Sequence, residues 1–224
     1  MSPHAGAAVL QAATPDATSR LLSGLALHVG AGLLRRLGPE RRADLLARVP
    51  EQTRRTLQSL ASHPDQTAGS LMDPLVLALP DDFTAREARA RVRATPEQAR
   101  YNVYVIDREH RLVGALNLRE LFLAAPSASL RSVMVPHVHR LSATADRRAI
   151  VRHPGWREVH SLPVVDPSGH YLGAIRYRAL RRIEEELRGV ADAADITVDA
   201  LGDLFSAGAS GVLKALTADK GGSP

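Results

Sequence analysis

A four-residue pattern occurs twice in this chain and divides most of it into two copies of one unit. The segments "LMDP" at 71–74 and "VMVP" at 133–136 both read Met-x-Pro. The residues that follow also align, because "YVIDREHRLVGALNLREL" at 104–121 matches "PVVDPSGHYLGAIRYRAL" at 163–180 at an offset of 59 residues. Self-similarity at a fixed spacing is the signature of a repeated structural unit. The chain therefore has to fold around a pair of similar halves.

Each copy begins with a short extended piece and a helix. The extended pieces are "LVLAL" at 75–79 and "HVHRL" at 137–141. In the first copy the helix opens with "TARE" at 84–87, in which Thr and Glu have the spacing of a capping box. We expect each copy to continue from this helix into a pair of strands.

The pair of strands forms a hairpin in each copy. In the second copy the turn is "DPSG" at 166–169, with proline and glycine where a type I turn prefers them. A last helix follows at about 119–125 in the first copy and at 178–188 in the second. The predicted order in both copies is strand, helix, strand, strand, helix.

A helical segment precedes the two copies. "GPERRADLLARV" at 38–49 and "PEQTRRTLQSL" at 50–60 each carry a proline and then an acid, which suit the first turn of a helix. "SHPDQTAGS" at 62–70 then interrupts the helical pattern with turn-forming residues. We place the predicted boundaries as follows: a helical domain at 1–62, the copies at 63–126 and 127–188, and a tail at 189–224.

Composition narrows the class of protein. Apolar residues make up 45% of the chain and aromatic residues only 4%, which is ordinary for a soluble protein with an aliphatic core. The chain has no cysteine, so we expect a reducing, cytoplasmic setting. The best candidate for a membrane span, the uncharged apolar run at 21–34, has 14 residues, fewer than the roughly 20 of a membrane-spanning helix. We expect neither a transmembrane segment nor a secretory signal.

The net charge of +5 is unevenly distributed. Residues 127–188 hold 11 basic and 6 acidic residues, whereas residues 189–224 hold 2 basic and 5 acidic residues. No basic run alternates with aromatic residues as a base-stacking surface would require. We expect no nucleic acid partner.

The order of elements, with Met-x-Pro before it and "VVD…G…LGAI" in the hairpin, resembles the cystathionine β-synthase (CBS) domain, which occurs in tandem pairs. The resemblance covers residues 70–188 and rests on two independent copies. It implies an α+β protein: a short helical N-terminal domain, tandem β-α-β-β-α CBS repeats that form an α/β pair, and a C-terminal amphipathic helix. CBS pairs commonly form flat dimers through their helices, so we expect a homodimer.

The junction "DQTAGSLMDP" at 65–74, which follows short helical repeats, resembles the junction of helical domain and CBS pair in MgtE magnesium transporters. In that family a connecting helix and a transmembrane pore follow the CBS pair. We expect this chain to correspond to the intracellular part without the pore.

In CBS pairs, adenine nucleotides bind where a pattern of Gly, two apolar residues, Ser or Thr, two further residues and Asp ends the hairpin. The first copy reads "GALNLRE", with Asn117 for the hydroxyl residue and Glu120 for the aspartate. The second reads "GAIRYRA", with Arg176 and Ala179 in those places. The resemblance therefore implies a nucleotide site at Asn117, Glu120 or Arg176 that departs from the family pattern. A cleft filled by the chain's own side chains is the alternative.

The tail carries four carboxylates at helical spacing. They lie within about 80° of arc on a helix, and they are Asp192, Asp195, Asp199 and Asp203. Like charges stacked in this way repel unless water, arginines or a cation neutralises them. In MgtE transporters, Mg²⁺ held between carboxylates draws the connecting helix toward the CBS pair. Three interpretations stay open: a solvated face, pairing with arginines such as Arg178, Arg181 or Arg182, and a Mg²⁺ site.

Several smaller features complete the pattern. His137 and His139 would point the same way on a strand, as two metal ligands do, but no third ligand is identifiable. Trp156 would pack between the copies, and "EEE" at 184–186 would be the exposed end of the last helix. No nucleophile with its base and no phosphate-binding loop is recognisable, so we expect no enzyme.

The sequence thus predicts a non-catalytic regulatory or sensor module, similar to the intracellular Mg²⁺-sensing part of an MgtE-type transporter. Such a module acts through ligand-dependent packing of its domains. Its partner would be a membrane transporter or another regulated protein. An adenine-nucleotide sensor and a ligand-free interaction module are the alternatives.

Overall fold

The computed structural model describes residue 25 and residues 27–189. The contacts of the chain divide it into two units, residues 1–180 and 181–224, and the boundaries expected from the sequence stay predictions.

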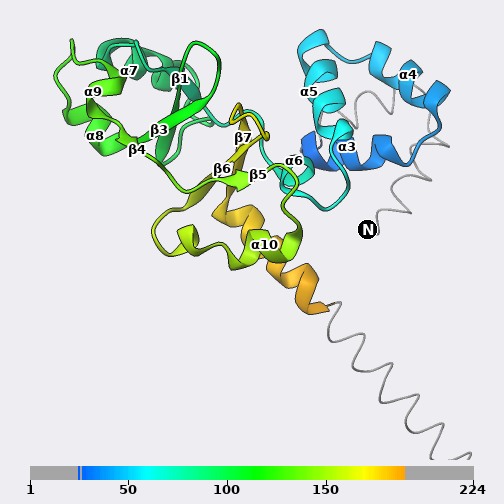
Figure 1. Cartoon of the computed structure of the whole chain (residues 1–224). Helices are drawn as coiled ribbons and strands as arrows, with labels where there is room; N and C mark the ends of the chain where they lie inside the picture. The colour runs from blue at the N-terminus through cyan, green and yellow to red at the C-terminus, as the bar shows by residue number, and fades with distance from the viewer. Residues whose placement is uncertain (1–24, 26, 190–224) are drawn as a thin grey trace, which may run out of the picture. The chain divides into compact units, whose positions relative to one another are not determined.

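The N-terminal part of the described chain is helical (Figure 1). Its helices are α3 (Leu27–Arg35), α4 (Pro39–Ala47) and α5 (Glu51–Ser62). Four leucines are fully buried in this part: Leu34, Leu45, Leu57 and Leu60. Pro39 starts its helix as predicted, because proline lacks the N–H that the first turn leaves unpaired. Pro50 instead caps α5 from outside.

The first repeat has the predicted order of elements. They are β1 (Ala78–Pro80), α7 (Ala85–Ala94), β2 (Asn102–Ile106), β3 (Leu112–Asn117) and α8 (Leu118–Leu123). Strand β2 pairs in parallel with β1 and antiparallel with β3. The predicted capping box is confirmed, since the Glu87 N–H donates to Thr84 Oγ1 at 3.3 Å and the Thr84 N–H donates to the Glu87 carboxylate at 2.8 Å. The Thr84 hydroxyl also donates to this carboxylate, at 2.7 Å. The hydrogen bonds that the carboxylate accepts from the Thr84 hydroxyl and from the Thr84 N–H lower the pKa of Glu87.

The second repeat has the same topology. Its elements are β5 (Leu141–Ser142), α10 (Arg147–Arg152), a 3-10 turn (Pro154–Arg157), β6 (Ser161–Val165), β7 (Tyr171–Arg176) and a helix described over 177–189. The predicted turn closes the hairpin, with the Gly169 N–H donating to the Asp166 carbonyl at 3.0 Å. The α+β fold class and both β-α-β-β-α repeats are therefore confirmed.

Between these elements, each Met-x-Pro segment docks on the repeat that it does not precede. The first exchanged segment, residues 67–76, contains helix α6 (Ala68–Leu71) and comes before the first repeat. Its Ala68 N–H donates to the Ala145 carbonyl of the second repeat at 2.8 Å. Further along, Asp73 exchanges two backbone hydrogen bonds with Ala174 of β7, at 2.8 and 3.0 Å. Helix α6 accordingly lies beside β5 and β7 (Figure 1).

The second exchanged segment, residues 129–138, does the converse. It contains α9 (Leu130–Val133) and β4 (Val135–Pro136), and it comes before the second repeat. The Leu130 N–H donates to the Phe83 carbonyl of the first repeat at 2.8 Å, and Val135 pairs with Ala115 of β3. Each segment therefore covers the free edge of the hairpin in the other repeat, which ties the two repeats together.

Close backbone approach makes this exchange dependent on glycine at two equivalent positions. A Cβ atom on Gly173 would lie 2.7 Å from the Asp73 carbonyl oxygen, and one on Gly114 would lie 2.8 Å from the Val135 carbonyl oxygen. Only glycine leaves room for the neighbouring chain here.

The hairpins of the two repeats also contact each other. At their tips, the Leu112 N–H donates to the Gly169 carbonyl at 3.0 Å, and the Tyr171 N–H donates to the His110 carbonyl at 2.9 Å. Deeper in the interface, the Tyr104 hydroxyl is 2.8 Å from Ser161 Oγ. Burial raises the pKa of Tyr104 to about 12, so this phenol stays neutral at physiological pH.

Trp156 does not belong to this interface. Its Nε1–H donates to the Ile150 carbonyl at 2.6 Å, and its ring lies 6.4 Å from that of Tyr177. Both partners are in the second repeat, so the prediction that Trp156 packs between the copies is wrong.

Replacing Gly173 with alanine should destabilise the protein, because the new methyl group meets backbone atoms of the first exchanged segment, which have little freedom to move. We expect Gly173→Ala to lower the free energy of unfolding by about 1–3 kcal/mol in a urea titration. The control is Gly32→Ala in α3, where a Cβ would meet only two arginine side chains, at 3.7 and 3.8 Å. This variant should not lower stability, because alanine is favoured over glycine within a helix. Equal stability of the two variants would contradict the close approach.

Candidate functional site

Asn117 and Glu120 lie on the first turn of α8. Asn117 ends β3, and its side-chain oxygen accepts a hydrogen bond from the Arg119 N–H at 2.8 Å, so it caps the helix. Glu120 lies three residues further and is exposed, as is Asn117. Residues three apart on a helix are neighbours. The structure therefore brings these two predicted site residues together at one surface.

Arg176 holds the equivalent position at the end of β7, but it is engaged with other parts of the chain. Its Nη2 lies 3.1 Å from the Glu97 carbonyl oxygen and 3.4 Å from that of Gln98, in the loop after α7. The same atom lies 3.4 Å from Asp73 Oδ2 of the first exchanged segment. The guanidinium thus joins three segments that are remote in sequence.

The three predicted nucleotide-site residues do not form one site. Asn117 and Glu120 belong to the first repeat and Arg176 to the second, and no hydrogen bond or ion pair joins them within residues 27–189. A nucleotide would have to bind at α8 without help from Arg176, or displace the partners that Arg176 already has.

The charged pair of Arg176 and Asp73 borders the phenols of Tyr104, which is buried, and Tyr171, which is partly buried. The rings of Tyr104 and Tyr171 lie 5.3 Å apart, and the Tyr171 hydroxyl donates to the Val76 carbonyl at 3.0 Å. Burial raises the pKa of Tyr171 well above its usual value, as it does for Tyr104. Both phenols stay neutral, so the ion pair is the charged feature of this part of the repeat interface.

Exposed aromatic side chains gather where the last helices of the repeats begin, a feature that the sequence analysis missed. The Tyr101 ring lies 5.2 Å from that of His160, which in turn lies 6.2 Å from that of Tyr177. Tyr101 is 59% exposed and Tyr177 is 46% exposed. The repeat alignment could have indicated this cluster, because Tyr101 and His160 occupy equivalent positions. Helix α8 adds Phe122 and Leu123, which are 45% and 74% exposed.

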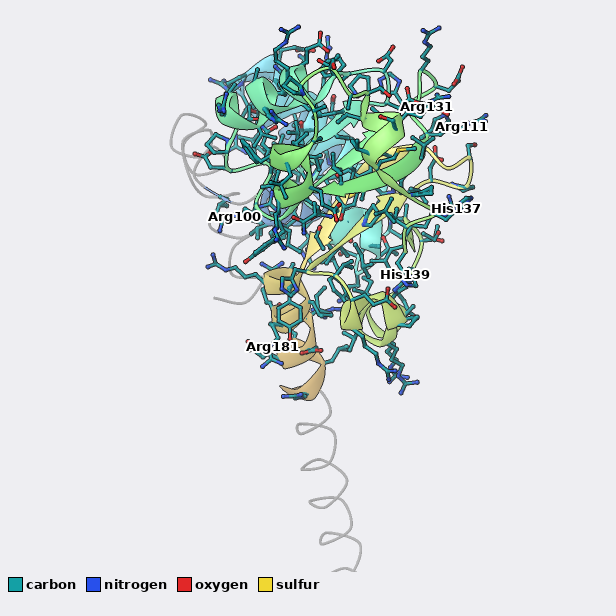
Figure 2. The ribbon with its side chains drawn as sticks, turned by 90° about the vertical axis from the view of Figure 1, so that its left-hand side faces the viewer. Arg100, Arg111, Arg131, His137, His139 and Arg181 are labelled. Carbon is teal, nitrogen blue, oxygen red and sulfur yellow. The ribbon has the colours of Figure 1, made fainter. Side chains whose placement is uncertain are left out.

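A cavity of about 510 Å³ beside the first repeat is rich in charge. Its lining residues are Asp81, Asp82, Asp107, Arg108, Glu109, Ser129 and Arg131. The one buried carboxylate among them, Asp81, is paired with Arg131, which Figure 2 labels. The carboxylates are therefore partly neutralised by the chain itself.

The prediction for His137 and His139 is wrong in its premise. They lie between β4 and β5 and not on a strand, and His137 has a left-handed backbone with φ of 55°. Both side chains are exposed (Figure 2), and His139 Nε2 lies 3.4 Å from a Glu158 carboxylate oxygen. Across residues 27–189, no group of three or more histidine or carboxylate side chains is arranged to hold a metal ion.

The acidic stripe of the tail lies outside the described residues, so Asp192, Asp195, Asp199 and Asp203 stay predicted site residues. The helix at 177–189 carries the arginines that were considered as partners of this stripe. Arg181 pairs with Glu184 at 3.1 Å, and Arg182 lies 3.9 Å from Glu186. The "EEE" segment is therefore not only an exposed helix end, because two of its carboxylates already pair with arginines.

Comparison with known proteins identifies relatives among magnesium transporters. No family model matches the chain. The magnesium transporter MgtE of Thermus thermophilus is 33% identical over 138 residues, which cover 61% of this chain and 30% of the relative. MgtE of Bacillus subtilis is 25% identical over 153 residues, covering 65% of this chain and 34% of the relative. The chain thus spans about a third of the length of these relatives. In the part of the chain that the structure describes, no helix is long and apolar enough to span a membrane.

Solved structures agree with this comparison. The cytosolic domain of the Mg²⁺ channel MgtE in complex with ATP has a TM-score of 0.72 and 28% identity, over 82% of this chain and 76% of that chain. Two further structures share the fold. The soluble part of a magnesium transporter has a TM-score of 0.69 and 21% identity, over 79% of this chain and 70% of that chain. A CBS pair domain from Shewanella oneidensis has a TM-score of 0.61 and 18% identity, over 80% of this chain and 98% of that chain. The helical segment and the tandem repeats are therefore homologous to the cytoplasmic region of the MgtE magnesium transporters, that is, to its N-terminal domain and CBS pair.

Proposed function

We propose that this chain is a non-catalytic regulatory module that responds to a ligand by changing the packing of its helical part, its CBS pair and residues 189–224. The homology to the MgtE cytoplasmic region supports a regulatory role, and the Mg²⁺ channel relative was solved with ATP. We place the module in the cytoplasm, where it would act on a membrane transporter or another regulated protein.

The observation that carries this proposal is the position of the first exchanged segment between the helical part and the second repeat. Toward the helical part, helix α6 of this segment contacts both α3 and α5, and Arg35 of α3 pairs with Asp65 just before the segment. A Cβ atom on Gly69 would lie 2.6 Å from the His63 ring, so the segment packs tightly against the end of α5. Toward the CBS pair, Asp73 bonds to Ala174 in both directions.

This arrangement can transmit a change in either direction. A ligand that binds one arrangement of the CBS pair better than another shifts the population toward that arrangement. Because packed interfaces adopt discrete arrangements rather than deforming continuously, a small shift at the repeats can change how the helical part is held. We favour Mg²⁺ at the acidic stripe as the ligand. An adenine nucleotide at Asn117, Glu120 or Arg176 is the second candidate, and a ligand-free interaction module the third.

Magnesium tests the proposal directly. Millimolar MgCl₂ should raise the melting temperature and protect residues 189–205 from hydrogen exchange, because the cation relieves repulsion among the stripe carboxylates. NaCl at matched ionic strength should do neither. The double variant Asp195→Asn, Asp199→Asn should lose the response, whereas Asp219→Asn, outside the stripe, should keep it. If protection exists without metal and weakens with salt, the stripe pairs with arginines instead. If MgCl₂ changes neither the melting temperature nor the hydrogen exchange of residues 189–205, the Mg²⁺ proposal fails.

Nucleotides should bind weakly. Both hydroxyl positions of the family pattern are replaced, and Arg176 is already held by Asp73 and two carbonyl oxygens. We expect dissociation constants above ~100 μM for ATP and AMP in calorimetry, a binding free energy weaker than about 5.5 kcal/mol. Glu120→Ala should reduce any binding, and Glu109→Ala, another exposed acid of the first repeat, should not. Tight saturable binding would support the nucleotide sensor over the Mg²⁺ module.

The exposed aromatic and aliphatic side chains near α8 suit self-association, because clustered exposed apolar groups mark interaction surfaces. We expect a homodimer through the CBS pair in light scattering at tens of micromolar. Leu123→Asp should shift the population to monomer, whereas Val29→Asp, at an exposed apolar position of the helical part, should leave the dimer intact. A wild-type monomer at these concentrations would rule out the dimer.

A further inference from the structure

The two exchanged segments are equivalent in backbone pairing but differ in charge. Asp73 of the first segment and Val135 of the second occupy the same position in Met-x-Pro. Their partners on the opposite repeat are also equivalent, since Asp73 pairs with Ala174 and Val135 with Ala115. Two residues beyond these alanines, the second repeat has Arg176 where the first has Asn117. Only the first segment can therefore form an ion pair at this place.

The geometry orients Asp73 for that ion pair. Asp73 Oδ1 accepts a hydrogen bond from the Leu75 N–H at 3.0 Å, which holds the carboxyl group across the turn. The other oxygen, Oδ2, lies 3.4 Å from Arg176 Nη2. The Arg176 side chain is 26% exposed and that of Asp73 is 39% exposed, so the pair is only partly screened by water.

Arg176 links this carboxylate to the first repeat as well. Its Nη2 also reaches the carbonyl oxygens of Glu97 and Gln98, and the Gln98 carbonyl accepts from the Leu77 N–H at 3.0 Å, just after the first exchanged segment. The Arg176 guanidinium thus contacts both the first exchanged segment and the loop after α7, and this loop accepts the hydrogen bond from Leu77. An arginine suits this role, because its planar fork can serve several acceptors at once while remaining charged.

The equivalent place in the first repeat has no such link. The Asn117 side chain is used as the cap of α8, and Val135 is 56% exposed. At this place the second exchanged segment is held by backbone pairing and by packing of Met134 against the core of the first repeat. Its own ion pair lies elsewhere, between Arg131 and the buried carboxylate of Asp81.

We propose that the Asp73–Arg176 pair is an electrostatic clamp that controls how often the first exchanged segment, and with it the connection to the helical part, detaches from the second repeat. The second exchanged segment is held by a different ion pair, that of Arg131 with Asp81 of the first repeat, so its opening does not depend on Asp73 or Arg176. The module is therefore asymmetric: the segment that leads to the helical part responds to the charges of Asp73 and Arg176, and its counterpart does not.

Hydrogen exchange of the ligand-free full chain tests the clamp. Asp73→Asn is nearly isosteric and can keep the hydrogen bond from the Leu75 N–H, but it removes the charge. At low salt this variant should accelerate exchange of peptides within residues 67–77 by roughly twofold to fivefold, the range expected for a partly exposed ion pair. The difference should shrink at 0.5 M NaCl, where charges are screened over a few ångströms.

Peptides within residues 129–138 provide an internal control and should exchange at the wild-type rate. A second control is Arg178→Gln, which removes an exposed arginine two residues beyond Arg176 and should change neither segment. Arg176→Gln should accelerate exchange at least as much as Asp73→Asn, because it also weakens the contacts with the loop after α7.

A charge swap makes the test independent of a general loss of stability. The double variant Asp73→Arg, Arg176→Asp should slow exchange of residues 67–77 relative to either single substitution, because opposite charges again face each other. If Asp73→Asn leaves exchange unchanged at low salt, or accelerates residues 129–138 equally, the clamp is wrong. These measurements need neither Mg²⁺ nor nucleotide, so their outcome is independent of the ligand proposed above.

Discussion

Two backbone hydrogen bonds between Asp73 and Ala174 hold this molecule together in a way that no single repeat could achieve. They form only because Gly173 leaves room for the Asp73 carbonyl, and the same arrangement recurs at Gly114 and Val135. An uncovered sheet edge leaves backbone groups without partners. By covering the edge of the other repeat, each exchanged segment satisfies these groups and makes the pair one interdependent structure.

This exchange also explains why the helical part can be coupled to the repeats. The first exchanged segment follows α5 and pairs with the second repeat before the chain enters the first repeat. This segment therefore contacts both the helical part and the second repeat. The buried residues along this route, Met72 among them, have little room for gradual displacement. A rearrangement of β7 must therefore change the conformation of the first exchanged segment or displace the helical part.

Local features of the fold were predictable from sequence, whereas the connections between the repeats were not. The capping box at Thr84 and the turn at Asp166–Gly169 depend on residues close together in the chain, and the structure confirms both. The exchange of the segments depends on docking between remote residues, for which the sequence offers no local signal. The role of Arg176 was missed for the same reason, since its partners lie at Asp73 and in the loop after α7. The error at His137 arose from assuming a strand where the backbone turns left-handed.

The crossing of the two segments has a consequence for how the chain acquires its structure. The contact of Asp73 with Ala174 closes a loop of roughly 100 residues, and such distant contacts form late because their loop entropy must be offset first. During synthesis, the second exchanged segment follows the first repeat directly and can cover the edge of its hairpin. The first exchanged segment has no partner until the hairpin of the second repeat has been synthesised. The segment that follows the N-terminal helices can therefore pair with the second repeat only when that repeat is complete. Docking of this segment consequently requires that both repeats have folded.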